Sequence, residues 1–290
     1  MVRRLLTIMA VMACMAACSN SGAKVNKPAT DSVAETPAKT TKMAQPTDNN
    51  SVKVEVSTTM GNFTVLLFGD TPQHRDNFVK LVKDHTYDGT LFHRVINEFM
   101  VQAGDPEAKT AKPGQRLGAG ELGYTLPAEI VFPKHYHKRG ALAAARQGDQ
   151  VNPERRSSSS QFYVVTGRKY DKAQLQQMQM QQTFYALAEQ HKAEIRDLQQ
   201  KRDTAALMKL QNQLIADSEK AIAEGKSPMS NEMVEVYANV GGAPHLDGQY
   251  TVFGEVISGM DTIDKIEKAE TDAADRPNED IRILSMKIVD

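Results

Sequence analysis

Residues 92–105 read Phe-His-Arg-Val-Ile-Asn-Glu-Phe-Met-Val-Gln-Ala-Gly-Asp, and the rest of the chain is organised around them. The alternation of apolar and polar residues predicts a strand, a bend near Asn97-Glu98 and a second strand that ends at Gly104-Asp105. If the strands lie side by side, Arg94 shares one hollow with Phe99, Met100 and Gln102. A charge beside a ring, a thioether and an amide favours a binding site over a core. The alternative is an ordinary strand pair in which Arg94 pairs with a surface carboxylate.

This stretch resembles the signature of the cyclophilin-type peptidyl-prolyl isomerases. Two later stretches extend the resemblance, Ser-Gln-Phe-Tyr-Val at residues 160–164 and Leu-Asp-Gly-Gln-Tyr-Thr-Val-Phe-Gly-Glu-Val at residues 246–256. The resemblance implies a mostly β fold, a closed antiparallel eight-stranded barrel with a helix plugging each end. We assign this barrel to residues 52–167 and 237–290.

Local patterns agree with that order of elements. Alternating apolar residues predict a β-hairpin over residues 52–68. Thr71-Pro72 predicts a helix start, with Thr71 as the N-cap and Pro72 at the first helical position. Small residues at 140–146 and apolar residues at 160–165 predict strands, and residues 260–268 and 281–288 predict a second helix and a last strand.

Composition excludes several classes of function. The 290-residue chain has a formal net charge of −1, which argues against a nucleic-acid partner. Its two cysteines, Cys14 and Cys18, precede the folded part, so no disulfide or cysteine metal site is expected there. His135 and His137 could suggest a metal pair, but no third ligand lies nearby in sequence. We therefore predict no metal and no cofactor.

The N-terminus predicts an exported lipoprotein. Arg3 and Arg4 precede an apolar run over residues 5–17, which is too short for a permanent span and suits a signal peptide, residues 1–17. The small residues before Cys18 resemble a bacterial lipobox, which implies cleavage before Cys18 and a lipid membrane anchor on it. Ser19 favours an outer-membrane lipoprotein of the cell envelope, facing the periplasm. An ordinary secretory signal with a chance cysteine is the alternative.

Two further segments lie outside the resemblance. Residues 18–51 are rich in Ser, Thr, Ala, Pro, Lys and Asn, which predicts a disordered linker. Residues 168–236 have strong helix composition and predict an inserted antiparallel hairpin, with helices at about 172–200 and 204–224 and Asp203 or Thr204 as the cap between them. The resemblance places this insertion beside the active site. The insertion could bind client proteins, or its apolar residues could serve only to pack its own helices together, or it could mediate dimerisation.

Site residues follow from the resemblance, position by position. Arg94 and Gln102 match catalytic residues, and the substrate-binding matches are Phe99, Met100, Ala145, Gln161, Tyr163, Leu246 and Tyr250. Arg146 replaces an asparagine of the family. Tyr163 stands where phenylalanine is common in the proline pocket, and a hydroxyl at that rim should be tolerated if it reaches water. His245 and Tyr250 replace the usual tryptophan and histidine, which leaves binding of the inhibitor cyclosporin open.

The implied function is isomerisation of X–Pro bonds in proline-containing polypeptides, assisting the folding of exported proteins. The chemistry would be non-covalent, with an arginine beside an apolar proline pocket. The alternative is a non-catalytic chaperone or assembly scaffold that binds proline peptides and acts through the helical arm.

Overall fold

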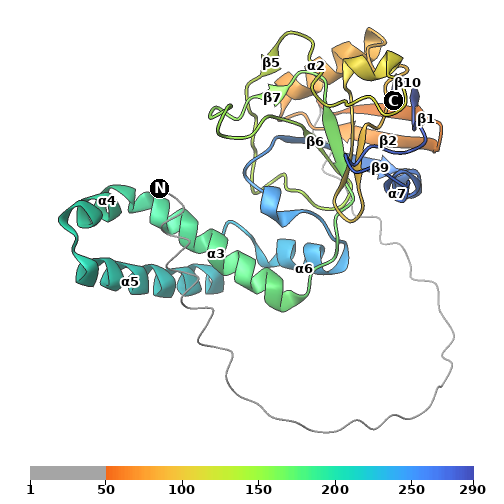
Figure 1. Ribbon diagram of the computed structural model, residues 1–290. Coiled ribbons are helices and arrows are strands. Elements are labelled where there is room, and N and C mark those ends of the chain that lie inside the picture. Colours follow the sequence, from red (N-terminus) through yellow and green to blue (C-terminus); the bar gives the residue numbers. More distant parts are fainter. Residues whose placement is uncertain (1–49) are drawn as a thin grey trace, which may run out of the picture. The chain divides into compact units, whose positions relative to one another are not determined.

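The protein was analysed as a computed structural model, which describes residues 50–290. Eight strands form one curled antiparallel sheet in the order β10-β1-β2-β9-β6-β8-β4-β3 (Figure 1). Their bounds are β1 (Val52–Thr58), β2 (Gly61–Leu67), β3 (Arg94–Ile96), β4 (Met100–Ala103), β6 (Ala141–Ala144), β8 (Phe162–Val165), β9 (Val252–Ser258) and β10 (Ile283–Val289). Two short strands, β5 (Thr125–Leu126) and β7 (Ser157–Ser158), pair separately.

The prediction of a closed barrel is wrong. The edge strands β3 and β10 do not pair, and a single bridge joins Leu91 to Arg282 across the gap. Backbone hydrogen bonds from Phe92 N to Ile281 O (2.9 Å) and from Ile283 N to Thr90 O (2.9 Å) partly span the opening. Closure fails because β3 has only three residues, so it offers too short a ladder for β10. The mostly β description is wrong too, since helices hold more of the described residues than strands do.

The main core lies between the sheet and two helices, α2 (Pro72–Lys83) and α7 (Met260–Glu267). The inward residues of β1 and β2 alternate along each strand, as a half-buried strand requires. Phe78 of α2 packs edge-on against Phe162 of β8, with ring centroids 5.3 Å apart. Thr71 does occupy the N-cap position, but its hydroxyl donates to Phe68 O (3.4 Å) and makes no capping bond.

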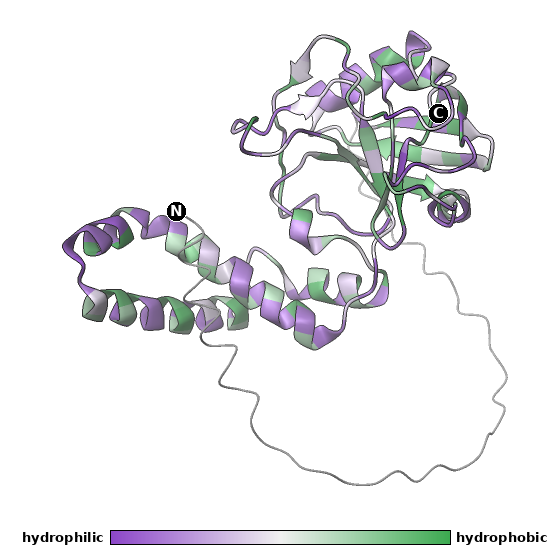
Figure 2. Cartoon of the chain, viewed as in Figure 1, coloured by the Kyte–Doolittle hydropathy of each residue, from purple (hydrophilic) through white to green (hydrophobic). Residues whose placement is uncertain are grey.

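The segment between β8 and β9 holds four helices, α3 (Lys172–Gln190), α4 (Lys192–Lys201), α5 (Thr204–Ala223) and α6 (Asn231–Asn239). The last helix runs past residue 236, the expected end of the insertion, and we count all of α6 as part of it. The expected first helix is interrupted at His191, and Asp203 caps α5 by accepting from Ala206 N (2.9 Å). Leu175, Phe184 and Leu214 are buried, whereas α4 has no buried residue. Hydrophilic residues run along α4, in contrast to the hydrophobic strands of the sheet (Figure 2). The apolar stripe is therefore used mainly for packing within the insertion.

The chain leaves and re-enters the sheet domain through a tight backbone joint. Gly242 N donates to Arg168 O (3.1 Å), and Arg139 N donates to Gly241 O (3.0 Å). Gly242 has φ +152°, and a Cβ there would lie 2.3 Å from His137 O and 2.5 Å from a ring carbon of Tyr237. Only glycine fits between these neighbours.

The predicted signal peptide, the predicted lipidation at Cys18 and almost all of the predicted linker fall outside the described residues. Within residues 50–290, no helix has the combination of length and apolar character that crossing a bilayer requires.

Candidate active site

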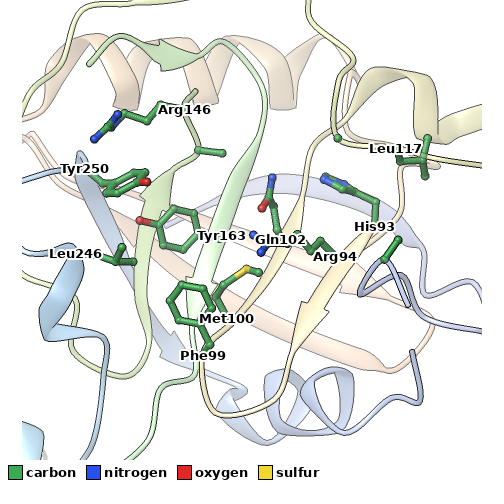
Figure 3. A pocket seen from close by; sticks show the side chains of 13 residues that line it. His93, Arg94, Phe99, Met100, Gln102, Leu117, Arg146, Tyr163, Leu246 and Tyr250 are labelled. Atoms are coloured by element: carbon green, nitrogen blue, oxygen red, sulfur yellow. The ribbon is translucent and has the colours of Figure 1, made fainter. Parts of the chain in front are cut away.

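A pocket of about 350 Å³ opens beside strands β3, β4, β6 and β8. Figure 3 shows Phe99, Met100 and Tyr163 gathered close together, with His93 and Leu117 on the opposite side and Arg146 and Tyr250 at one end. The lining residues are His93, Arg94, Phe99, Met100, Gln102, Leu117, Gly118, Ala145, Arg146, Tyr163, Leu246, Tyr250 and Ala274. The structure thus brings together every substrate or catalytic candidate from the sequence except Gln161.

Arg94 reaches the pocket because of the register of the β3–β4 pair. Arg94 lies opposite Gln102, and Ile96 lies opposite Met100. The Arg94 side chain is 43% exposed, and its Nε donates to Asp275 Oδ2 at 3.4 Å. Arg94 therefore does pair with a carboxylate, as the alternative interpretation of the sequence expected. The same side chain also lines the pocket.

The apolar floor is continuous with a small second core. Met100 and Tyr163 belong to this buried cluster, and Phe99, Leu246 and Tyr250 pack against it. His245 packs against Phe99, with ring centroids 5.4 Å apart. The floor can accept an apolar ring and excludes water from one side of it.

The Tyr163 hydroxyl is accommodated by a buried histidine rather than by water. Tyr163 is 5% exposed, and its hydroxyl lies 3.0 Å from His137 Nε2. Burial raises the pKa of Tyr163 well above its usual value, so the hydroxyl stays protonated. A buried hydroxyl needs such a partner, and His137 supplies one.

Gln161 lies behind the pocket wall. Its side-chain amide donates to Gly118 O (3.1 Å) and Gly120 O (2.9 Å), and its Oε1 accepts from Gln102 Nε2 (3.0 Å). The buried Asp105 holds the same loop by accepting from Gly118 N and Gly120 N. Gln161 therefore fixes the loop that carries Leu117 and orients Gln102.

The far end of the pocket is cationic. The Arg146 guanidinium stacks over the Tyr250 ring at 4.3 Å and pairs with Asp149 (2.6 Å). Its Nε donates to Gln249 O (3.0 Å). The side-chain amide that the resemblance implies at position 146 is thus replaced by a guanidinium whose Nε and Nη1 are already engaged.

The two histidines considered as a metal pair have separate partners. His135 Nε2 lies 2.7 Å from Asp70 Oδ1, whereas His137 faces Asp247 and Tyr163. Among residues 50–290, no group of three or more His, Cys, Asp and Glu side chains is placed to hold a metal ion.

Sequence reasoning missed His93 as a pocket residue, although it precedes Arg94 directly. His93 is 4% exposed, and neither ring nitrogen has a hydrogen-bond partner among the described residues. Burial lowers its pKa from 6.5 to about 4, against the opposing effects of Asp105 and of the backbone at Leu91, and the nearby Arg94 and Arg276 act in the same direction as burial. The ring is neutral at physiological pH.

This burial makes stability fall in acid. Above about pH 6.5 the His93 ring is neutral in both the folded and the unfolded states. Between about pH 6.5 and pH 4 the unfolded chain gains a proton that the folded chain does not, so the free energy of unfolding should drop by about 3 kcal/mol. Urea denaturation at pH 7.5, 5.5 and 4.5 measures this change in the free energy of unfolding. His93→Asn should lose less stability over this range, and equal losses in the two proteins would contradict the assignment.

Comparison with known proteins decides the family. The family model "Cyclophilin type peptidyl-prolyl cis-trans isomerase/CLD" matches residues 52–185 and 171–288. The chain belongs to this family. It is accordingly a cyclophilin-type peptidyl-prolyl cis-trans isomerase, as the sequence resemblance predicted.

Two bacterial relatives match most of this chain, one of them over nearly its whole length and the other over less than half of its own. A Staphylococcus saprophyticus protein named as a peptidyl-prolyl cis-trans isomerase is 31% identical over 245 residues, covering 84% of this chain and 94% of its own. A Streptococcus pyogenes protein named as a bifunctional phosphatase and isomerase is 30% identical, covering 82% of this chain and 39% of its own. A crystal structure of a Cryptosporidium parvum cyclophilin matches with a TM-score of 0.49 and 21% identity, covering 83% of this chain and 98% of its own.

Proposed function

We propose that the pocket around Arg94 isomerises X–Pro bonds without a covalent step. The observation that supports this most is the position of one guanidinium beside an apolar floor, on a strand pair whose register aims Arg94 and Gln102 at the same space. A proline ring would rest on Phe99, Met100, Tyr163 and Leu246. The substrates are proline-containing polypeptides.

The required acceleration matches what these groups supply. The X–Pro bond has a rotation barrier of about 18–20 kcal/mol and exchanges in tens to hundreds of seconds uncatalysed. A turnover of about 10 s⁻¹ needs about 4 kcal/mol of stabilisation. A charged hydrogen bond from Arg94 to the proline nitrogen or the preceding carbonyl contributes about 1.5–3 kcal/mol. The apolar floor strengthens that bond by lowering the local dielectric.

Asp275 directs the arginine. Its carboxylate takes the Nε donor of Arg94, so the two terminal nitrogens remain as donors for the substrate. Purified protein mixed with an X–Pro tetrapeptide tests the proposal directly. Exchange no faster than in buffer would refute it.

We also place this isomerase in the cell envelope, as an outer-membrane lipoprotein that assists exported proteins. Support comes from the apolar run before Cys18 and from the linker composition of residues 18–51. The protein should fractionate with membranes when expressed in a bacterium, and Cys18→Ser should move it to the soluble fraction. Equal membrane association of the two would contradict lipidation.

A chaperone acting through the arm has less support, because Leu175, Phe184 and Leu214 are buried within the insertion.

A further inference from the structure

A line of buried polar side chains runs from the pocket floor to the insertion. The Tyr163 hydroxyl lies 3.0 Å from His137 Nε2, His137 Nδ1 lies 3.0 Å from Asp247 Oδ1, and the Tyr237 hydroxyl lies 2.7 Å from Asp247 Oδ2. All four residues are buried. Tyr237 belongs to α6, so the line links the insertion to the residue on which the proline ring would rest.

The hydrogen bonds along this line fit a single assignment of donors and acceptors. Asp247 accepts from the Tyr237 hydroxyl at one oxygen and from the backbone N of His137 (2.9 Å) at the other. An acceptor at Asp247 Oδ1 keeps the imidazole proton on Nδ1, which leaves Nε2 to accept from the Tyr163 hydroxyl. Each member therefore holds the next one in a defined orientation.

The backbone around this line leaves little room for adjustment. Ala243 N donates to His137 O (2.8 Å), and Tyr170 N donates to Tyr237 O (3.3 Å). Gly242 leaves no space for a side chain, because an added Cβ would lie 2.3 Å from His137 O and 2.5 Å from the Tyr237 ring. A rigid surround is what allows a hydroxyl on α6 to determine the position of a ring in the pocket.

From these contacts we infer that Tyr237, Asp247 and His137 are positioning residues for isomerisation, which hold the Tyr163 ring in the pocket floor. The insertion thereby completes the active site through α6. The inference rests on the proposed proline pocket. It assigns to the insertion a function in substrate binding by this same chain.

The test is kinetic and uses tyrosine hydroxyls of the same cluster. Tyr237→Phe removes one hydroxyl without changing shape and should lower kcat/KM for an X–Pro tetrapeptide about three- to tenfold. The loss should lie mainly in KM, because the floor holds the ring in both the ground and the transition states. Tyr170→Phe, in the same apolar cluster, is the matched control and should change kcat/KM by less than about two-fold.

A double-mutant cycle separates positioning from general packing. In a Tyr163→Phe background the hydrogen bond from Tyr163 to His137 is already absent. Adding Tyr237→Phe should therefore cause no further loss of kcat/KM. An undiminished loss in that background, or a Tyr237→Phe protein with unchanged kinetics, would overturn the inference.

The His137 tautomer and the activity of Arg94→Ala provide two independent tests. The ¹⁵N NMR signals of His137 in the unaltered protein should report the neutral Nδ1–H tautomer, and a proton on Nε2 alone would overturn the inference even if Tyr237→Phe fails to fold. Arg94→Ala reports separately on the pocket itself. Loss of activity in Arg94→Ala with normal kinetics in Tyr237→Phe would leave the proposed function standing and remove only the positioning line.

Discussion

Arg94→Ala should lower kcat/KM for an X–Pro tetrapeptide about 10- to 100-fold, because the lost charged hydrogen bond is worth about 1.5–3 kcal/mol in the transition state. The effect should fall mainly on kcat, since the donor acts on a nitrogen or carbonyl whose charge changes as the amide twists. A protease-free assay that follows the cis and trans populations by NMR measures the rate without a coupling enzyme.

The fold should survive this change. Arg94 is 43% exposed and its contact with Asp275 is 3.4 Å long, so this ion pair contributes at most about 1 kcal/mol to stability. Arg196→Ala removes an exposed guanidinium from α4 and is the matched control for loss of charge. Arg94→Lys should recover only part of the activity, because an ammonium lacks the fixed fork of donors. Unchanged turnover in Arg94→Ala would mean that Arg94 only pairs with Asp275 and has no part in catalysis.

The sequence was sufficient to predict how the pocket is assembled from β3 and β4. Alternation around residues 92–105 placed Arg94 and Gln102 on one face, and their observed register agrees with it. The pairing of β6 with β8 added Ala145 and Tyr163. The β3–β4 pair was predictable because local periodicity dictates which side chains share a face of a sheet, whereas Ala145 and Tyr163 were predicted from the family resemblance.

Other features depend on contacts that no local pattern encodes. The open edge of the sheet arises from the length of β3, which single-sequence periodicity leaves undefined by a few residues. The buried bond of Tyr163 required His137, 26 positions away, and Asp247, 110 positions from His137. The resemblance also pointed away from it, because a phenylalanine at position 163 needs no partner. The helical break at His191 lacks the glycine or proline that would have marked it.

Gly242→Ala should reduce stability by about 3 kcal/mol or more and impair turnover as well. An added Cβ would lie 2.3 Å from His137 O and 2.5 Å from Tyr237 Cε1, at φ +152°, so both the backbone and the steric fit oppose it. The backbone oxygen cannot rotate away, because it already accepts from Ala243 N. Relief of the clash must therefore move either the loop before β6 that carries His137 or the helix α6 that carries Tyr237.

The two possible movements have different consequences for the pocket. Displacing His137 withdraws the acceptor of the Tyr163 hydroxyl, whereas displacing Tyr237 breaks its bond to Asp247. Either one should raise KM in the fraction that remains folded. Gly148→Ala is the matched control, because no atom lies within 4 Å of its added Cβ and the site is exposed. Thermal denaturation with a tetrapeptide assay below the midpoint measures both effects, and a Gly242→Ala protein as stable as Gly148→Ala would mean that the joint adapts without strain.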